Sequence, residues 1–194
     1  MRTVFLDVDT QLDFVSPAGA LYAAGAERVI EAAARLNRHA AANGIALIST
    51  ADAHVENDAE FAQWPAHCVC GCLGQRKPQA TLIEKAIVIT NRRSLPDTAG
   101  APQIIVEKQT VDVFATSTVG PLLDRLGADR FVVYGVVTEV CVWHAARGLL
   151  RIGKAVTIVT DAVAALRQET GEQALDELRA AGAAMATASE VLRI

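Results

Sequence analysis

The sequence predicts a three-layer αβα fold built around a mainly parallel central sheet. Apolar, β-branched runs of strand length alternate with segments of helical periodicity along the whole chain. Of the 194 residues, 52% are hydrophobic, which is enough to fill the core of such a fold. No internal repeat and no linker of biased composition interrupts the alternation. We therefore expect a single domain over residues 1–194.

The strands are predicted from short apolar runs bounded by turn-forming or polar residues. The run at residues 131–134 (FVVY) is β-branched and aromatic throughout, as is typical of a strand buried on both faces. Gly135 is expected to end this strand, and Asp161 to begin the turn after a later one. The predicted strands cover residues 4–8, 45–50, 86–90, 104–107, 131–134, 155–160 and 183–188.

The helices are predicted from apolar residues that recur every three to four positions. Val29, Ala33, Leu36 and Ala40 lie on one face of a helix over residues 26–43, and Gly44 ends it. The other predicted helices are a short one ending at residues 81–85 and longer ones over residues 117–126, 140–150 and 168–181.

Composition excludes several classes of function. The net charge is −4 and Lys and Arg do not cluster, which argues against nucleic acid or an anionic membrane as a partner. No apolar run approaches the ~18 residues that a membrane helix needs. The first residues (MRTVFLDV) already resemble a strand, so no export signal is expected. With four cysteines and no such signal, we expect a cytoplasmic protein with reduced thiols.

Chemically capable side chains follow several predicted strands directly. Asp9 stands between Asp7 and Asp13 after the first strand, and Lys108 ends the strand at residues 104–107. Because parallel strands bring their carboxyl ends to one edge of a sheet, these groups and Cys141 can converge there. An acid at this edge can act as a general base, and a lysine can hold a thiolate or an oxyanion. Separately, each has a plainer explanation as a helix-capping acid, a surface lysine or a core cysteine.

Cys141 is predicted to lie in the first turn of the helix over residues 140–150. The unpaired backbone N–H groups of such a turn favour an anion, so the thiolate would be stabilised and the thiol more nucleophilic. The same N–H groups could hold the oxyanion of a tetrahedral intermediate.

The segment after the second strand is rich in possible metal ligands. Asp52, His54, Glu60 and His67 mix carboxylate and imidazole groups, which suits a divalent metal ion such as zinc, iron or manganese. The alternative from residue types alone is a solvated acidic loop with incidental histidines.

Three cysteines directly follow His67, and they suggest a second possible metal site. Cys68, Cys70 and Cys72 could bind a structural zinc ion, although no C-x-x-C unit elsewhere completes such a site. We expect small, half-buried thiols in a compact loop. A structural zinc protein would instead unfold when a chelator removes its metal.

These separated motifs, in their order, resemble those of the isochorismatase-like cysteine hydrolases, and among them most closely the nicotinamidases. Residues 9–14 (DTQLDF) are similar to the family's D-x-Q-x-D-F, and residues 135–142 (GVVTEVCV) to its nucleophile turn. The resemblance implies an isochorismatase-like, Rossmann-like fold and a catalytic triad of Asp9, Lys108 and Cys141. It also implies a cis peptide before Val137, and an oxyanion hole made by the N–H groups of Val137 and Cys141.

The resemblance extends to the metal and substrate residues. Residues 52–54 (DAH) and 64–69 (WPAHCV) are similar to the metal-binding elements of nicotinamidases. It implies a metal site of Asp52, His54, Glu60 and His67, in which Glu60 stands where the family usually has histidine. Phe14 and Trp64 resemble the aromatic residues that sandwich the pyridine ring.

The implied function is a metal-containing cysteine amidohydrolase that deamidates nicotinamide to nicotinate and ammonia through a thioester, a reaction of NAD salvage. Leu12 replaces an asparagine common in nicotinamidases, and Cys72 a threonine. A related amidase for carbamoyl, ureido or maleamate-type substrates is the alternative, and an arginine among Arg92, Arg93 and Arg147 could then hold an anionic substrate. A non-catalytic α/β module that binds a small molecule or a protein is a further alternative. The family commonly forms homo-oligomers, so we expect one here.

Overall fold

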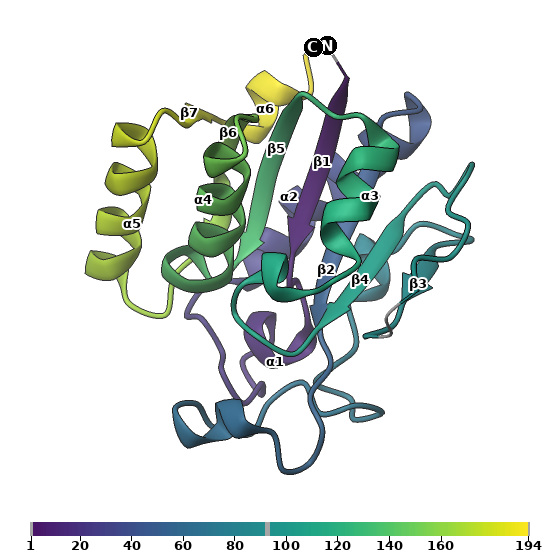
Figure 1. Cartoon of the computed structure of the whole chain (residues 1–194). Coiled ribbons are helices and arrows are strands. Elements are labelled where there is room, and N and C mark those ends of the chain that lie inside the picture. The colour runs from purple at the N-terminus through teal and green to yellow at the C-terminus, as the bar shows by residue number, and fades with distance from the viewer. Residues whose placement is uncertain (1, 92–93, 194) are drawn as a thin grey trace.

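The computed structural model describes residues 2–91 and 94–193, and its centre is one seven-stranded sheet. The strand order is β3-β4-β2-β1-β5-β6-β7, and every strand pairing in the described chain is parallel (Figure 1). The predicted parallel α/β fold is therefore confirmed. The strands are β1 (Thr3–Val8), β2 (Ala46–Asp52), β3 (Ile87–Ile89), β4 (Ile104–Lys108), β5 (Arg130–Val136), β6 (Ala155–Ala164) and β7 (Ala184–Ala186).

Helices cover both faces of the sheet. One apolar cluster joins the sheet to α3, α4 and α5, and a second joins its other face to α2 and α6 (Figure 1). The α-helices are α1 (Leu12–Val15), α2 (Glu27–Ala42), α3 (Val119–Leu126), α4 (Trp143–Arg151), α5 (Gln168–Ala180) and α6 (Ala188–Val191). Single turns are η1 (Ala59–Ala62), η2 (Gln79–Thr81) and η3 (Val113–Ala115), which are 3₁₀, and η4 (Thr138–Val142), which is a π turn.

Strand β1 lies at the middle of the sheet and is buried on both faces. Its side chains alternate between the two apolar clusters: Leu6 and Val8 pack toward α3 and α4, and Phe5 packs toward α2. The apolar run that predicted this strand therefore serves both layers. Asp7 interrupts it as a completely buried carboxylate.

The prediction that Gly135 ends its strand is wrong. Strand β5 continues to Val136, and its register against β6 shifts between Val133 and Gly135. A Cβ atom at Gly135 would lie 2.0 Å from the carbonyl oxygen of Val8, so only glycine lets β5 approach β1 this closely. Past the irregularity, β6 pairs with β5 as far as Ala164, so Asp161 lies within β6 and begins no turn.

A predicted short helix and the end of the last predicted strand also differ from the structure. No α-helix covers residues 81–85: the 3₁₀ turn η2 ends at Thr81, and Lys85 has a left-handed φ of 65° that a helix does not allow. The last strand is shorter than predicted because residues 188–191 form α6. Thr187 and Glu190 make a capping box at its start, a T-x-x-E signal that the prediction overlooked.

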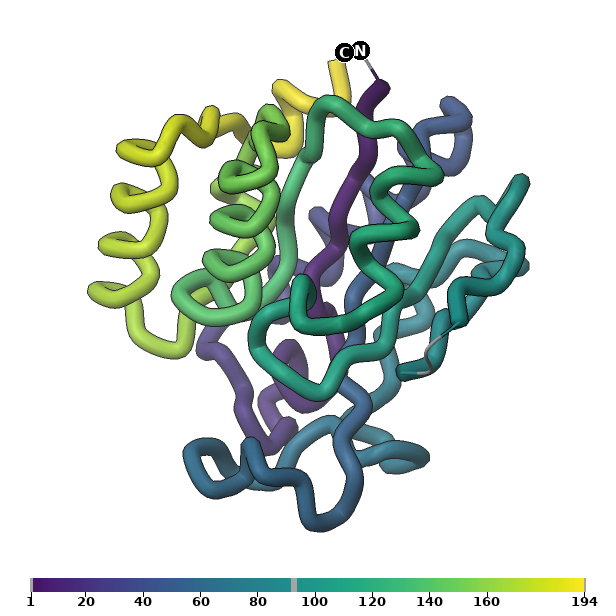
Figure 2. Tube along the Cα trace, in the orientation of Figure 1, coloured from purple at the N-terminus to yellow at the C-terminus, as the bar shows by residue number. Residues whose placement is uncertain are grey.

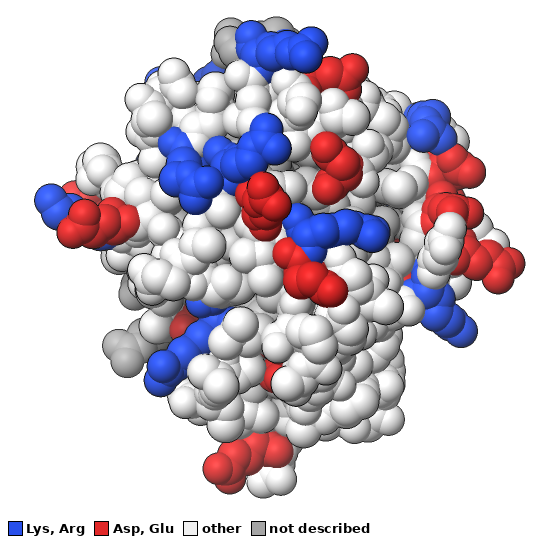
Figure 3. All heavy atoms as spheres, turned by 180° about the vertical axis from the view of Figure 1, so that it is seen from behind, with Lys and Arg blue, Asp and Glu red and all other residues white. Residues whose placement is uncertain are grey.

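The carboxyl ends of the central strands meet at one end of the sheet, opposite both chain termini (Figure 1). The long connection from β2 to β3 runs across this end, as its trace shows (Figure 2). On the face turned away in Figure 1, acidic and basic side chains are interspersed (Figure 3). None of the described helices has the length and apolar character needed to cross a membrane.

Candidate active site

A buried lysine lies at the centre of the site. Lys108 ends β4, and its Nζ lies 2.8 Å from Asp9 Oδ2 and 3.6 Å from Cys141 Sγ, and also contacts Asp52 Oδ1. Asp52 and Lys108 end β2 and β4, Asp9 directly follows β1, and Cys141 lies in the turn η4 after β5. All four residues are at least 94% buried. Carboxylate oxygens of Asp9 and Asp52 lie within 4.8 Å of Cys141 Sγ. The structure therefore brings together the three groups predicted to converge, and adds Asp52 to them.

Asp9 is held in an unusual backbone conformation. Its φ is 45°, in the left-handed region, although it directly follows the extended strand β1. Thr50 on β2 holds the residue at two points: its hydroxyl donates to Asp9 Oδ1 at 2.6 Å and accepts from the Asp9 N–H at 3.1 Å. The turn and these bonds aim the carboxylate at Lys108.

Burial and the neighbouring charges together shift the pKa of every group in this cluster. Burial lowers the pKa of Lys108, but Asp52 and Asp9 outweigh it and raise this pKa well above its ordinary value. Burial, reinforced by Asp52 and opposed by Lys108, raises the pKa of Asp9. Lys108 therefore remains a cation at the centre of the site.

The structure contradicts the expected thiolate. Cys141 lies in the π turn η4, before the α-helix proper begins at Trp143. Burial raises the pKa of its thiol well above the ordinary value, and Lys108 only partly offsets this. The thiol is therefore neutral at rest and needs a base to become a nucleophile.

The turn before Cys141 has the backbone that the resemblance implied. The Val136–Val137 peptide is cis. The carbonyl of Val137 accepts hydrogen bonds from the N–H groups of Val140 and Val142, both at 3.1 Å. Val137 and Cys141 both line the pocket described below.

Two histidines converge on the second carboxylate oxygen of Asp52. The Nε2 atoms of His54 and His67 lie 3.9 and 3.8 Å from Asp52 Oδ2, and all three groups are buried. Their Nδ1 atoms face outward, with that of His54 3.0 Å from Asp58 Oδ2 and that of His67 2.8 Å from the carbonyl of Pro65. Within the described chain, His54 Nε2 has no hydrogen-bond partner.

This arrangement fits a divalent metal ion. One atom from each of Asp52, His54 and His67 lies within 4.8 Å of the others, and each is a ligand type that zinc, iron or manganese accepts. Burial would raise the pKa of Asp52, but Lys108 and His67 outweigh it, so this carboxyl stays ionised. Asp52 therefore belongs both to the cluster around Lys108 and to this candidate metal site, which the sequence did not indicate.

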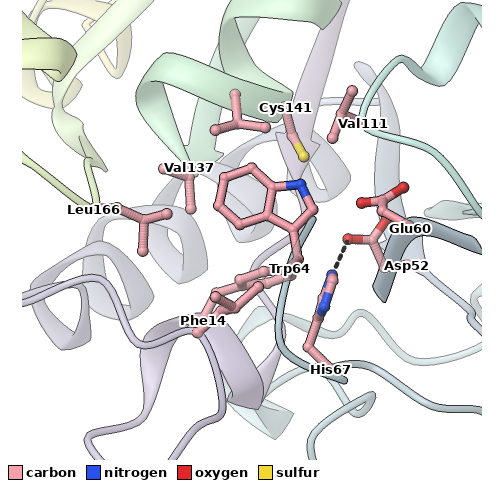
Figure 4. Close-up of a pocket in the computed structure, with 11 residues that line it drawn as sticks. Phe14, Asp52, Glu60, Trp64, His67, Val111, Val137, Cys141 and Leu166 are labelled. Carbon is pink, nitrogen blue, oxygen red and sulfur yellow. Dashed lines mark ion pairs between the residues drawn. The ribbon is translucent and has the colours of Figure 1, made fainter. Parts of the chain in front are cut away.

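Glu60 stands beside this group rather than in it. Its half-buried side chain lines the pocket near Asp52 and His67, but it is not among the three groups that converge (Figure 4). Asp58, which the sequence analysis missed, accepts a hydrogen bond from the Glu60 N–H at 3.0 Å and also contacts His54. Its position four residues after His54 was the only available signal.

The site opens into a small pocket with mostly apolar walls. Phe14 and Trp64 both line it, and in Figure 4 the ring of Trp64 lies toward Cys141. No described Lys or Arg lines it. Of the three arginines considered for an anionic substrate, Arg147 has its guanidinium 5.2 Å above the ring of Trp143. Arg92 and Arg93 lie outside the described residues. The lining residues are Phe14, Leu21, Asp52, Glu60, Trp64, His67, Val111, Val137, Val140, Cys141 and Leu166.

The three neighbouring thiols do not form a cluster of their own. Cys68 is buried, and its N–H donates to Asp13 Oδ2 at 2.7 Å, whereas Cys70 and Cys72 are exposed rather than half-buried. No three-ligand group found in the described chain contains any of them. A structural zinc site at these cysteines therefore has no support.

Solved structures of similar fold include two amidases. The chain is 26% identical to the pyrazinamidase of Pyrococcus horikoshii, solved in complex with zinc, with a TM-score of 0.80 over 96% of this chain and 99% of the other. It is 25% identical to the pyrazinamidase/nicotinamidase of Streptococcus mutans UA159, with a TM-score of 0.80 over 95% of this chain and 99% of the other.

A curated relative and a family model complete the comparison. Streptothricin hydrolase of Streptomyces noursei is 38% identical over 68 residues, which are 35% of this chain and only 25% of that protein. The model of the isochorismatase domain matches residues 3–190, nearly the whole chain. The chain therefore belongs to the isochorismatase family.

Proposed function

We propose that the protein is a metal-containing cysteine amidohydrolase that deamidates nicotinamide to nicotinate and ammonia. The observation that carries this proposal is the buried set of Asp9, Lys108 and Cys141, which opens into an aromatic pocket beside Asp52, His54 and His67. Similarity to a pyrazinamidase and a pyrazinamidase/nicotinamidase over nearly the full length supports it.

In the proposed reaction, Asp9 is the general base for a neutral thiol. As Cys141 Sγ attacks the amide carbonyl, the thiol proton moves to the Asp9 carboxylate, and a C–S bond forms. The N–H groups of Val137 and Cys141 would hold the oxyanion. When the C–N bond breaks, protonated Asp9 returns its proton to the departing ammonia and leaves a thioester on Cys141.

The same carboxylate can complete the cycle. Asp9 accepts a proton from water as the water attacks the thioester carbonyl, and the proton then returns to the departing thiolate, which releases the acid product. Lys108 stays charged throughout because Asp52 and Asp9 raise its pKa. Its ammonium would stabilise the negative charge as it passes between Cys141 and Asp9.

Asp52, His54 and His67 would hold the metal ion, and Glu60 could reach it from the pocket wall as a further ligand. The buried, unpartnered Nε2 of His54 and the two Nε2 atoms that face one carboxylate oxygen support this assignment. A bound zinc, iron or manganese ion supplies Lewis acidity and lowers the pKa of a coordinated water.

The pocket favours a neutral, planar aromatic amide. Phe14 and Trp64 provide two aromatic surfaces, and the remaining walls are mainly aliphatic. An anionic carbamoyl, ureido or maleamate-type substrate would need a cation, and no described Lys or Arg lines the pocket. The alternative amidases are for this reason less well supported than a nicotinamidase.

The test is ammonia release from nicotinamide by the purified protein, measured as isolated, after chelation, and after zinc, iron or manganese is restored. We expect release that disappears with the metal and returns with it. If no metal supports release from nicotinamide but another amide is hydrolysed, the substrate assignment is wrong. If no amide is hydrolysed at all, the non-catalytic binding module becomes the better interpretation.

A further inference from the structure

A second buried charge pair, which the proposed mechanism does not use, lies behind Asp9. Lys77 Nζ is 3.5 Å from Asp7 Oδ2, and the two residues are only 8% and 0% exposed. Removal of two charges from water is costly, and an apolar pair of similar size often stabilises a fold at least as well. The position of this pair therefore calls for a role other than stability.

The carboxylate of Asp7 is fully engaged on the α2 side of the sheet. It accepts hydrogen bonds from Thr10 Oγ1 at 2.8 Å, Asn37 Nδ2 at 3.0 Å and Ser49 Oγ at 3.1 Å. Asn37 is itself fixed by the hydroxyl of Tyr134, which donates to its Oδ1 at 2.5 Å. Asp7 is thus a rigid anchor in the middle of β1.

Two connections lead from this pair to Asp9. The first is the hydrogen bond from Thr10, the residue directly after Asp9, to Asp7. The second starts at Lys77, whose Nζ donates to the carbonyl of Thr50 at 3.2 Å, and Thr50 in turn holds the carboxylate and the N–H of Asp9. Asp9 is therefore restrained through its chain neighbour and through its side chain.

Asp9 needs such restraint because its backbone is strained. A left-handed φ of 45° is uncommon for a residue with a side chain. Asp adopts it more readily than most, but the conformation still depends on surroundings that favour it. Without these connections, the turn could relax and carry the carboxylate away from Lys108 and Cys141. Neither Asp7 nor Lys77 lines the pocket, so substrate contacts would not change directly.

We infer that Asp7 and Lys77 are positioning residues, which hold Asp9 in its strained turn and so keep its carboxylate aligned with Cys141. This inference rests on the proposed role of Asp9 as the base. It adds to the triad two residues that support Asp9 from the α2 side of the sheet.

The experiment compares Asp7→Asn, Lys77→Met and the double variant with wild type. The first readout is the rate constant for alkylation of Cys141 by iodoacetamide, which requires no knowledge of the substrate. Because Cys70 and Cys72 are exposed, the modified peptides must be resolved by mass spectrometry. The second readout is kcat and KM for ammonia release from nicotinamide.

Two control variants accompany these. Leu36→Ala removes a buried side chain on the same face and destabilises the fold without a polar link to Asp9. Asp9→Asn removes the base itself. Thermal unfolding of every variant separates loss of stability from loss of alignment.

We expect Asp7→Asn, Lys77→Met and the double variant to lower both kcat and the Cys141 alkylation rate about 10-fold or more, with KM changed less than about 2-fold. Leu36→Ala should keep both rates at the wild-type value even where it loses as much thermal stability as the charge-pair variants. A variant that removes only one charge leaves the other buried without a partner and could fail to fold; the double variant removes both charges and avoids this. If neither the single variants nor the double variant is soluble, the test is made on Thr10→Val, which removes one hydroxyl and keeps both charges.

The possible failures are distinguishable. The inference would be overturned if the variants without the Asp7–Lys77 pair kept the wild-type kcat and Cys141 alkylation rate. If Thr10→Val is the one variant that folds, wild-type rates in Thr10→Val would overturn it. If Asp9→Asn also alkylates at the wild-type rate, the role of Asp9 as the base is wrong, and the proposed function must be revised first.

Discussion

At the scale of single residues, the site depends on one buried cation. Lys108 contacts two carboxylates and the Cys141 thiol, and the carboxylates raise its pKa while burial raises that of the thiol. The resting site is thus a neutral thiol beside an ion pair. In the proposed mechanism, such a thiol depends on Asp9 for activation far more than a thiolate at a helix N-terminus would.

The pH dependence of turnover should report this dependence on Asp9. Only the ionised carboxylate can accept the thiol proton, so the rate falls as pH falls through the pKa of Asp9. Because burial raises that pKa, half of the maximal kcat/KM should be lost at a pH above 3.8, the ordinary value for an aspartate. A pH–rate profile at constant metal content checks this, and a midpoint at or below that value would contradict it.

Gly135 is the residue on which the packing of β5 against β1 depends. Gly135→Ala would place a Cβ 2.0 Å from the Val8 carbonyl at a φ of 118°, and should cost more than about 3 kcal/mol of unfolding free energy or prevent folding. Gly44→Ala is the matched control: it has a φ of 64° with no atom near the added Cβ, and should cost about 1–2 kcal/mol. Denaturant titration measures both, and equal losses would refute the steric argument.

At the scale of elements, the short turn η1 links two parts of the candidate metal site. Asp58, its N-cap, holds the backbone of Glu60 with Oδ1 and faces His54 Nδ1 with Oδ2. An isolated β-bridge pairs His54 with Val69, near the other end of the same loop, and this pairing places His67 close to His54. A carboxylate behind a ligating histidine fixes the orientation of its ring and raises its basicity.

Asp58→Asn should therefore weaken metal binding. We expect its affinity for zinc or manganese, measured by calorimetric titration of the metal-free protein, to fall about 10- to 100-fold. Glu56→Gln, an exposed carboxylate in the same loop, is the control and should bind like wild type. Equal affinities of both variants would show that Asp58 does not orient a ligand.

At the scale of the whole molecule, parallel pairing explains why much of the site was predictable. The ends of β1, β2, β4 and β5 meet at one edge because β1 lies between β2 and β5, and β2 between β1 and β4. Asp9, Lys108 and Cys141 could thus be grouped from strand positions alone, without knowledge of their contacts. The pocket walls at Phe14 and Trp64 followed from the family resemblance instead.

The remaining features depend on tertiary contacts that no local pattern encodes. The pairing of Asp7 with Lys77 joins β1 to a loop residue 70 positions further along the chain. The double use of Asp52 depends on its register against Lys108. The raised pKa of Cys141 reflects how deeply it is buried. Local propensity also misjudged Gly135, because the close approach of β1 overrides the tendency of glycine to end a strand.

The central claim is that Cys141 forms a covalent intermediate with its amide substrate. Rapid acid quenching during turnover of nicotinamide, followed by peptide mass spectrometry, should reveal a nicotinoyl group on the peptide that carries Cys141. Cys141→Ala should keep the fold and lose both the adduct and ammonia release. Ammonia release retained by Cys141→Ala would contradict the account.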